Sequence, residues 1–370
     1  MAVPSRNGRS PERVLHIVPA LFDANDGVIG GAERYVLELA RHMANVVPTR
    51  LVTFGDRSRD ERTGTLEIRV IGGPWYVRGQ RSNPVSSAVL GEVRRARVVH
   101  CHQQHVAASS LAALTARLLR RRVFCTELGG GGWDISAYIS TDRWYDGHLH
   151  ISEYSRRIAG HSRREWAQVV FGGVDASRFS PDERTPRDIP VLFVGRILPH
   201  KGINDLVDAI DPDVKAWIVG PATSAAYLEE LRRRATGKQI EFVTDCDDDA
   251  LVAAYRRAAC VVLPSVYRDM YGGETRVPEL LGQTLLEGMA CGTPGICTEV
   301  ASLPEVVEHG RTGLVVLPND PAGLRAAIRW MLNHPDERTR MGERARARVV
   351  EQFNWNEVVR RCMEAYAGCA

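Results

Sequence analysis

Short apolar runs alternate with helical patterns along most of this chain, and this alternation constrains the fold more than any other feature. Apolar runs with the length of β-strands lie at 14–18, 51–54, 68–71, 98–101, 123–126, 148–151, 169–171, 191–194, 216–219, 240–243, 260–263, 295–297 and 313–316. Helical patterns separate many of them, for example at 32–43, 107–119, 203–210, 225–234, 248–259 and 285–290. Strands that alternate with helices form parallel sheets covered on both faces. The sequence therefore predicts an α/β fold.

One polar segment, 175–190, interrupts the alternation. It contains three prolines and is typical of a linker. A chain of 370 residues has room for about two domains. We therefore expect two Rossmann-like, doubly wound domains that face each other across a cleft. Ligands bind beyond the carboxyl ends of the strands in such folds, so the cleft is the expected active site.

Composition argues against several classes of protein. The formal charge of +3 is small for 370 residues, so no nucleic-acid partner is expected. The eight cysteines form no Cys-x-x-Cys pair, which indicates a reducing cytoplasm and no structural zinc. No uncharged apolar run reaches about 18 residues, so neither a signal peptide nor a membrane span is expected. The arginine-rich segments 94–97 and 119–122 are expected to be solvated; the alternative is peripheral contact with anionic lipid at the inner membrane face.

Lys201 stands out because the chain has only three lysines (Lys201, Lys215 and Lys238) beside forty-five arginines. A lysine retained in such a sequence is a candidate for a position that requires an ammonium group. It follows the apolar run 191–194, Arg196 and a short loop, and it precedes a helical pattern. A guanidinium and an ammonium group five residues apart at a helix N-terminus form a site for a polyanion such as a diphosphate. The alternative is a solvated lysine at a helix start.

The segment 278–294 carries two glutamates on either side of a glycine turn. Glu279 precedes Gly282, and Glu287 lies inside the helical pattern that follows the turn. The first amides of that helix, from Gln283 and Thr284, are free to bind an anion. The two carboxylates can then accept hydrogen bonds from two sets of sugar hydroxyls while the amides hold phosphate between them. The alternative is a capping glutamate and an exposed helical glutamate, which leaves the surrounding Gly-x-x-x-x-Glu-x-Met-Ala-x-Gly-x-Pro pattern unexplained.

These motifs resemble those of the retaining family 4 glycosyltransferases, which have the two-domain GT-B fold. The resemblance covers nearly all of the chain and rests on Gly30-Gly31-Ala32-Glu33-Arg34, the segment 172–179, Gly195-Arg196 with Lys201, Glu279 to Glu287, Leu303-Pro304-Glu305, the segment 310–313 and Phe353-Asn354-Trp355. It implies an acceptor-binding N-terminal domain at 1–180 and a nucleotide-sugar-binding C-terminal domain at 187–352. It also implies that a last helix within 353–370 crosses back to the N-terminal domain.

The resemblance implies a role for each matching residue. Arg196 and Lys201 would neutralise the donor diphosphate as a leaving group, and Glu279 would bind hydroxyls of the transferred sugar. These three are the expected catalytic residues. The further donor-binding groups would be the backbone of Leu281, Gly282, Gln283 and Thr284 around the phosphate and sugar, Glu287 at the ribose, and Gly30 and Gly31 where the N-terminal domain approaches the phosphate.

The implied reaction moves a sugar from a nucleotide-diphosphate sugar to an acceptor hydroxyl with retention of configuration. Preorganised cations and amides would stabilise the charge that builds on the diphosphate. The leaving phosphate would take the acceptor proton, so no protein base is required. No metal or cofactor is expected beside the nucleotide-sugar co-substrate, and the acceptor would be an envelope glycan, a lipid-linked sugar or a small molecule such as a natural product. The alternatives are an epimerase or phosphorylase on the same fold, and a non-catalytic sugar-nucleotide-binding protein.

One position departs from the family pattern. Many relatives have Thr-x-His-Gly after a first-domain strand, with the histidine at the 6-hydroxyl of the transferred sugar, whereas this chain has Thr126-Glu127-Leu128-Gly129. We therefore hypothesise a deoxysugar or pentose donor; alternatively Glu127, His102 or a loop residue replaces the contact. The expected residues on the acceptor and sugar side are His102, Glu127, Leu128 and Asp134.

Two sequence patterns suggest a metal, and we expect neither to bind one. Asp245 and Asp247 have the Asp-x-Asp spacing that holds a divalent ion in a different glycosyltransferase fold. They precede a helical pattern, where capping and the helix dipole also favour acidic residues. The histidines His100, His102 and His105 follow a strand end. We place His102 in the cleft and expect the other two to be packed or solvated.

Overall fold

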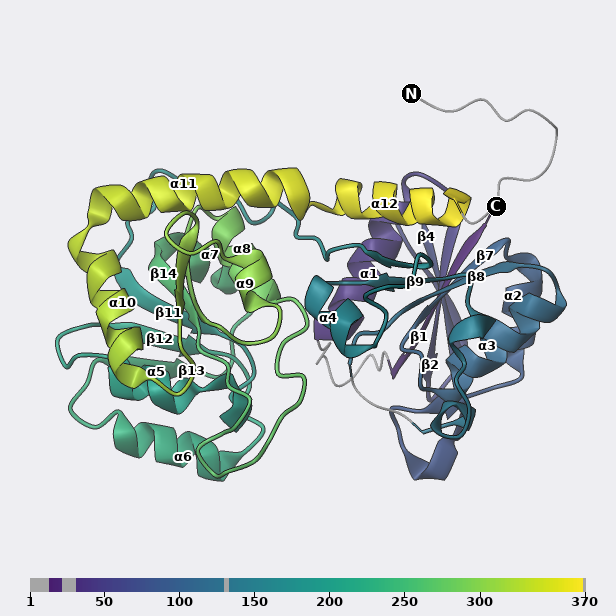
Figure 1. The fold of residues 1–370 in the computed structure, drawn as a ribbon, viewed down its shortest axis with the longest axis horizontal. Coiled ribbons are helices and arrows are strands. Elements are labelled where there is room, and N and C mark those ends of the chain that lie inside the picture. The colour runs from purple at the N-terminus through teal and green to yellow at the C-terminus, as the bar shows by residue number, and fades with distance from the viewer. Residues whose placement is uncertain (1–12, 22–30, 130–132, 369–370) are drawn as a thin grey trace. The chain divides into compact units, whose positions relative to one another are not determined.

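The computed structural model describes residues 13–21, 31–129 and 133–368. It consists of two compact units (Figure 1). Unit 1 comprises the described residues within 1–151, 155–170 and 358–370, and unit 2 comprises residues 152–154 and 171–357. The polar segment 175–190 thus groups with unit 2, and it contains no helix or strand before Ile189.

The sheet of unit 1 has eight strands in the order β10-β9-β8-β7-β1-β2-β4-β3. Every neighbouring pair is parallel except β3 and β4, which are antiparallel. A short antiparallel ribbon joins β5 and β6. The strands are β1 Val14–Leu21, β2 Thr49–Gly55, β3 Arg59–Thr63, β4 Leu66–Gly72, β5 Trp75–Tyr76, β6 Pro84–Val85, β7 Val98–His102, β8 Arg122–Thr126, β9 Gly147–His150 and β10 Ala167–Val169.

Helices cover both faces of this sheet. In Figure 1, α1 lies on one face, and α2 and α3 lie on the other. The helices of unit 1 are α1 Gly31–Ala44, α2 Ala88–Arg95, α3 Ala107–Leu118, most of α4 Glu153–Ile158, most of α12 Trp355–Gly368, and the short 3-10 turns η1 Val77–Gly79, η2 Ile135–Ala137 and η3 Asp142–Trp144.

Side chains of β1 and β7 alternate between the two faces, as successive residues of a strand must. The apolar core beneath α2 and α3 receives every second residue: Leu15, Ile17, Val99 and Cys101. His16, His100 and His102 point to the opposite face and are completely buried. There His16 Nε2 lies 3.2 Å from Met43 Sδ of α1, and His100 Nδ1 lies 2.7 Å from the Tyr366 hydroxyl of α12. The last helix is therefore part of the packing of unit 1.

The sheet of unit 2 has six strands, all parallel, in the order β13-β12-β11-β14-β15-β16. Its strands are β11 Ile189–Val194, β12 Ala216–Val219, β13 Ile240–Val243, β14 Ala258–Leu263, β15 Gly295–Thr298 and β16 Gly313–Val316. Its helices are η4 Pro199–Lys201, α5 Ile203–Ala209, α6 Ala225–Arg234, α7 Asp248–Arg257, α8 Gln283–Ala290, α9 Leu303–Val306, α10 Pro321–Asn333 and α11 Pro335–Gln352. The alternation predicted from sequence is confirmed in both units.

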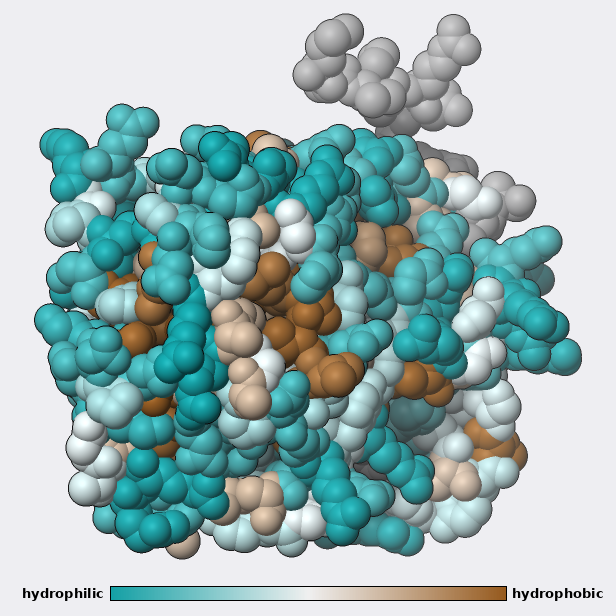
Figure 2. Space-filling model, turned by 60° about the vertical axis from the view of Figure 1, so that its left-hand side comes forward, coloured by the Kyte–Doolittle hydropathy of each residue, from teal (hydrophilic) through white to brown (hydrophobic). Residues whose placement is uncertain are grey.

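Apolar side chains fill the interior of each unit. Hydrophilic residues cover most of the face shown in Figure 2, with apolar residues gathered in smaller patches. Within the described ranges, no helix combines the length and the hydropathy that a membrane span requires.

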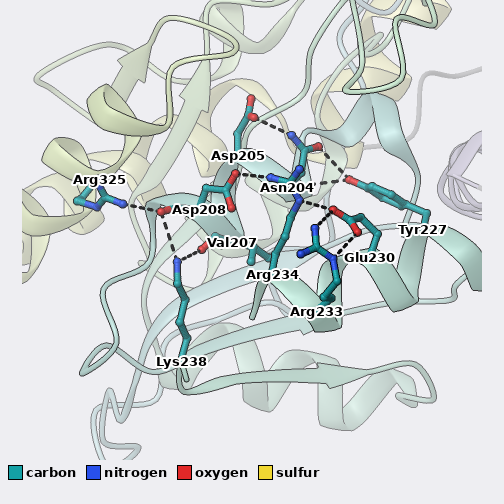
Figure 3. Close-up of polar contacts among 10 residues, drawn as sticks. All are labelled: Asn204, Asp205, Val207, Asp208, Tyr227, Glu230, Arg233, Arg234, Lys238 and Arg325. Carbon is teal, nitrogen blue, oxygen red and sulfur yellow. Dashed lines mark hydrogen bonds and ion pairs between the residues drawn. The ribbon is translucent and has the colours of Figure 1, made fainter. Parts of the chain in front are cut away.

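A polar network fixes helix α5 (Figure 3). This helix begins two residues after Lys201. The C-terminal carbonyls of α5 accept hydrogen bonds from two cations: Lys238 Nζ lies 2.6 Å from Val207 O, and Arg325 Nη2 lies 2.5 Å from Asp208 O. Cations near the C-terminus of a helix are favoured by its dipole. Lys238 therefore has a structural role, whereas Lys215 is exposed.

Asp205 on the same helix is a buried carboxyl, and burial raises its pKa to about 6, with the charge of Asp208 adding to the effect. Its Oδ1 accepts a hydrogen bond of 2.7 Å from Asn204 Nδ2. A carboxyl whose pKa is higher in the folded state favours folding at low pH, and this contribution is lost as the pH rises through 6. At pH 8 the ionised Asp205 therefore destabilises unit 2.

We expect Asp205→Asn to raise the melting temperature at pH 8 and to change it much less at pH 4.5. The stabilisation at pH 8 should be about 2 kcal/mol, because the amide removes a buried charge and keeps an oxygen for Asn204. Thermal unfolding of wild type and variant across this pH range measures the difference. The control is Asp211→Asn, since Arg329 lowers the pKa of Asp211, and that variant should lose stability at pH 8. An equal shift of Asp205→Asn at both pH values would contradict the assignment.

Candidate donor-binding active site

The predicted donor residues lie where the strand order of unit 2 reverses. β11 and β14 are neighbours in the middle of the sheet, with β12 beyond β11 and β15 beyond β14. Doubly wound folds bind ligands at this switch point, beyond the carboxyl ends of the strands. The loop after β11 carries Arg196 and Lys201, and the segment after β14 carries Ser265 and Glu279.

Lys201 and Glu279 form a nearly buried ion pair. Lys201 Nζ contacts Glu279 Oε1, and the two side chains are 14% and 10% exposed. Ser265 Oγ donates a hydrogen bond of 2.7 Å to the same carboxylate oxygen. A buried ion pair needs such additional hydrogen bonds, because removing both charges from water costs several kcal/mol. Glu279 is therefore held in one orientation, and its Oε2 has no partner among the residues that the structure describes.

His200 lies among the charges of this site. Burial lowers the pKa of His200, the charge of Lys201 lowers it further, and the charge of Glu279 opposes this. The charge of Arg196 also lowers the pKa of His200. Arg196 is exposed, and it forms no hydrogen bond or ion pair with another residue of the described ranges. A cation without a protein partner is thus available to an anionic ligand.

Helix α8 begins at this site with a glycine in the left-handed conformation. Gly282 has φ +85°, and a Cβ there would lie 2.8 Å from Leu303 Cδ2. Its carbonyl accepts hydrogen bonds from the amides of Leu285 and Leu286, at 3.0 and 3.3 Å. The preceding amides, of Gln283 and Thr284, are among the first four of the helix and have no intrahelical acceptor. The turn therefore presents two backbone donors to an anion.

Glu287, the second glutamate of the motif, lies inside α8 and is 4% exposed. Its Oε2 accepts a hydrogen bond of 2.8 Å from the hydroxyl of Tyr255 in α7. Tyr255 is completely buried, so this contact orients the glutamate carboxylate from within the core. Tyr255 and Ser265 are two positioning residues that the sequence analysis missed.

Two family descriptions match adjoining parts of the sequence: Glycosyltransferase Family 4 matches residues 29–178, and Glycosyl transferases group 1 matches residues 175–348. The chain belongs to glycosyltransferase family 4. The resemblance inferred from the motifs is therefore confirmed, and the two matches together span both units.

Several curated proteins are similar to this family 4 chain. It is 32% identical over 207 residues to a glycogen synthase of Mycobacterium tuberculosis, covering 54% of this chain and 47% of that protein. It is 34% identical over 164 residues to the D-rhamnosyltransferase WbpZ of Pseudomonas aeruginosa, covering 44% and 41%. It is 28% identical over 324 residues to an alpha-maltose-1-phosphate synthase of Mycolicibacterium smegmatis, covering 75% and 80%. The chain spans about half the length of the first two relatives.

Solved structures share the fold over nearly the whole chain. HepE of Anabaena, in complex with UDP and glucose, has a TM-score of 0.71 at 17% identity, covering 96% of this chain and 100% of that one. Sucrose-phosphate synthase of Thermosynechococcus elongatus has a TM-score of 0.71 at 21% identity, covering 96% and 98%. The predicted GT-B fold, with two parallel-sheet α/β domains, is confirmed.

The two carboxylates expected on the acceptor side, Glu127 and Asp134, accept hydrogen bonds from other residues of unit 1. Glu127 uses both carboxylate oxygens to accept backbone amides, from Gln104 at 2.8 Å and from Gly129 at 3.0 Å. Asp134 is 6% exposed and accepts hydrogen bonds from the amide of Ser136 and from the Ser110 hydroxyl. These contacts hold both carboxylates in place. Contact of either carboxylate with an acceptor stays a prediction.

Leu128 and His102 are also buried in this glycosyltransferase. Leu128 is 9% exposed, and His102 has no exposed surface. His102 Nε2 lies 2.9 Å from His16 Nδ1, so its described contact is with the interior of unit 1. Gly31 begins α1, and a Cβ there would meet no atom within 4 Å. Gly30, the other predicted phosphate-side glycine, lies outside the described residues.

The aspartate-rich segment before α7 caps that helix, as predicted. Asp247 is the N-cap residue, and its Oδ1 accepts hydrogen bonds from the amides of Asp249 at 3.0 Å and Ala250 at 2.7 Å. The interpretation of His100 and His105 is also confirmed: His100 is completely buried, and His105 is exposed.

Proposed function

We propose that this chain transfers a sugar from a nucleoside-diphosphate sugar to an acceptor hydroxyl, with retention of anomeric configuration. The observation that carries the proposal is the Lys201–Glu279 ion pair at the strand-order switch of unit 2. Arg196, an exposed cation without a protein partner in the described ranges, is on the same loop as Lys201. Membership of family 4 supports the same reaction.

In the proposed reaction the bond between the anomeric carbon and the distal phosphate oxygen breaks, and a bond to the acceptor oxygen forms on the same face of the sugar. Negative charge then builds on the diphosphate. Lys201 and the amides of Gln283 and Thr284 stabilise that charge from fixed positions, and Arg196 adds a further positive charge. The leaving diphosphate takes the proton of the acceptor hydroxyl, so the step balances without a protein base.

The two glutamates are assigned to the donor. Glu279 already binds Lys201 through Oε1, so its Oε2 is the atom proposed to accept a sugar hydroxyl. Glu287 is proposed to bind the ribose, with Tyr255 fixing its carboxylate. No step is assigned to Glu279 as a nucleophile, because its carboxylate is neutralised by the lysine beside it.

Incubation of the purified chain with a panel of UDP-, GDP-, ADP- and TDP-sugars and hydroxyl acceptors tests the proposal. Mass spectrometry should detect a glycosylated acceptor, and proton NMR should show the anomeric configuration of the donor in the product. A changed nucleotide sugar without acceptor would instead indicate an epimerase, and a sugar phosphate formed from inorganic phosphate would indicate a phosphorylase. Nucleotide binding without turnover would indicate a non-catalytic binding protein. Each of these three results would contradict the proposal.

The donor sugar is proposed to lack a 6-hydroxyl. Leu128 stands where many relatives have the histidine that contacts this hydroxyl, and the carboxylate of Glu127 is already occupied by two backbone amides. The similarity to a D-rhamnosyltransferase is in line with this idea, because rhamnose is a 6-deoxyhexose.

We expect wild type to prefer a 6-deoxyhexose or pentose donor, and Leu128→His to shift the ratio of kcat/KM toward the parent hexose by about 10-fold or more. An unpaired hydroxyl against a leucine loses a hydrogen bond, whereas a histidine restores it. Competition between GDP-rhamnose and GDP-mannose, and between the matching TDP and UDP pairs, measures the ratio. A clear preference of wild type for the ordinary hexose would contradict the assignment.

The proposed acceptor is an envelope glycan, a lipid-linked sugar or a natural product. A cytoplasmic protein at the inner membrane face would fit a lipid-linked acceptor, with the arginines of 94–97 and 119–122 as the membrane contact.

A further inference from the structure

Three buried histidines meet beside β9 of unit 1: His148, His150 and His161. Each offers a ring nitrogen that lies within 4.8 Å of one ring nitrogen of each of the others. His148 and His150 are two residues apart on a strand, so their side chains share one face of the sheet. His161 comes from the loop between α4 and β10. Their exposures are 2%, 2% and 5%.

The spacing within this cluster fits a metal ion. His150 Nε2 lies 3.1 Å from His161 Nδ1. Two imidazole nitrogens bound to one tetrahedral zinc ion at 2.0–2.1 Å are about 3.3 Å apart. This pair therefore already has nearly the required separation, and a ring nitrogen of His148 lies within 4.8 Å of the other two ligand atoms. The alternative explanation of the contact is a hydrogen bond between two neutral imidazoles.

Asp142 supplies the outer contacts that metal-binding histidines need. Its Oδ2 lies 3.4 Å from His161 Nε2, and its backbone oxygen lies 3.5 Å from His148 Nε2. A histidine that binds a metal through one ring nitrogen almost always donates its other N–H to a carboxylate or a carbonyl. Gln104 Nε2 in turn donates a hydrogen bond of 2.8 Å to Asp142 Oδ1 and fixes the carboxylate.

Hydrogen bonding within the described residues does not account for the cluster completely. His150 Nδ1 is buried and has no hydrogen-bond partner there. This nitrogen lies across the ring from Nε2, so it indicates a buried water molecule beside the cluster.

The second histidine cluster of unit 1 is more fully hydrogen-bonded, although His102 Nδ1 is also buried without a partner among the described residues. In His16, His100 and His102, most ring nitrogens have close partners in the protein, including the Tyr366 hydroxyl at 2.7 Å and Thr126 Oγ1 at 2.8 Å. That cluster is a hydrogen-bonded part of the core. The contacts of Asp142 with His148 and His161 are longer, at 3.5 and 3.4 Å.

We propose that His148, His150 and His161 bind one divalent transition-metal ion, zinc in the first instance, with Asp142 as the outer carboxylate. Three imidazoles leave the fourth position to a water molecule. β10 is an edge strand of three residues that pairs with β9 alone. His161 lies in the loop before β10, so a metal that joins it to His148 and His150 of β9 would stabilise this edge of the sheet. The site is structural and separate from the donor residues of unit 2. The proposal revises the expectation of no structural zinc.

Zinc content and zinc-dependent stability test the proposal. The chain is purified without a histidine tag, stripped with a chelator, and titrated with ZnCl2 while its melting temperature and its zinc content by mass spectrometry are followed. Wild type should bind one zinc per chain, and its melting temperature should rise with zinc concentration. His161→Gln should abolish both effects. The control His42→Ala changes a histidine of α1 outside both clusters and should bind zinc as wild type does.

Asp142→Asn provides a second variant in case His161→Gln does not fold. It keeps all three imidazoles and should weaken zinc binding by about 10- to 100-fold, because the outer carboxylate is lost. Cobalt(II) bound to wild type should give the strong visible absorption of a tetrahedral site. Absence of bound zinc in wild type, or the same zinc affinity in Asp142→Asn, would overturn the proposal. Zinc retained by folded His161→Gln would also overturn it and would indicate the other cluster.

Discussion

Lys201→Ala is expected to lower kcat/KM for sugar transfer by about 10²- to 10³-fold, because removing one preorganised donor from a developing oxyanion costs this much. The ammonium group is held beside Glu279, on the loop that also carries Arg196, and both cations would face the leaving diphosphate. Steady-state kinetics with the identified donor measures the effect. The matched control is Lys215→Ala, since Lys215 is exposed, and its kcat/KM should equal that of wild type.

The loss must be separated from a loss of folding. Lys201→Ala leaves the Glu279 carboxylate buried without its cation, which can cost about 3–5 kcal/mol of stability. The double variant Lys201→Ala/Glu279→Gln removes both charges and should recover much of that stability. It should remain as inactive as the single variant, because the diphosphate still lacks its lysine. Recovery of activity together with stability would show that Lys201 has only a structural role.

Gly202→Ala is expected to have the largest effect on stability. Gly202 has φ +63°, and a Cβ there would lie 2.0 Å from the backbone oxygen of Pro264. The left-handed conformation alone costs an alanine about 1–2 kcal/mol. The clash with backbone cannot be relieved by a rotamer change, so the total should exceed about 3 kcal/mol. Because Pro264 follows β14, relief of the clash would also separate Lys201 from the segment that carries Ser265.

The control for this prediction is Gly237→Ala. Gly237 has φ +81°, but a Cβ there would meet no atom within 4 Å, so only the backbone strain of about 1 kcal/mol applies. At about 2–4 °C per kcal/mol for a unit of this size, Gly202→Ala should melt at least about 6 °C below wild type and well below Gly237→Ala. Equal melting temperatures of the two variants would contradict the argument.

Much of the fold was predictable from sequence because the buried parallel strands are nearly continuous apolar runs. The strand β3 was missed, since its sequence Arg59-Asp60-Glu61-Arg62-Thr63 is almost entirely charged. It lies at the edge of the sheet, where charged side chains remain in solvent and guard against further pairing. The pattern of apolar residues along the sequence therefore does not predict such a strand.

The donor residues were predictable as a set, but their contacts were not. The motifs predicted separate roles for Lys201 and Glu279. In the structure the two side chains form an ion pair, and Ser265 donates a hydrogen bond to the same glutamate. The signal for Ser265 was its position just after a central apolar strand, at the switch point. Tyr255 gave no signal, because a tyrosine in a helical pattern is ordinarily a core residue.

The histidine cluster of His148, His150 and His161 shows a further limit of sequence reasoning. Its third member is a loop residue that tertiary packing places against β9, and its outer carboxylate comes from η3. The spacing of His100, His102 and His105 was conspicuous in the sequence, yet His105 lies outside both clusters. Histidine spacing alone thus indicated the wrong set, because loops and the fold decide which rings meet.

The central claim is that Lys201 helps to bind a nucleoside diphosphate in unit 2. We would titrate UDP, GDP, ADP and TDP, without added metal, into wild type, Lys201→Ala and Lys215→Ala, and follow the melting temperature. A ligand that binds only the folded protein raises this temperature with its concentration. One nucleotide should stabilise wild type and Lys215→Ala and fail to stabilise Lys201→Ala. No stabilisation by any nucleotide, or equal stabilisation of all three proteins, would contradict the account.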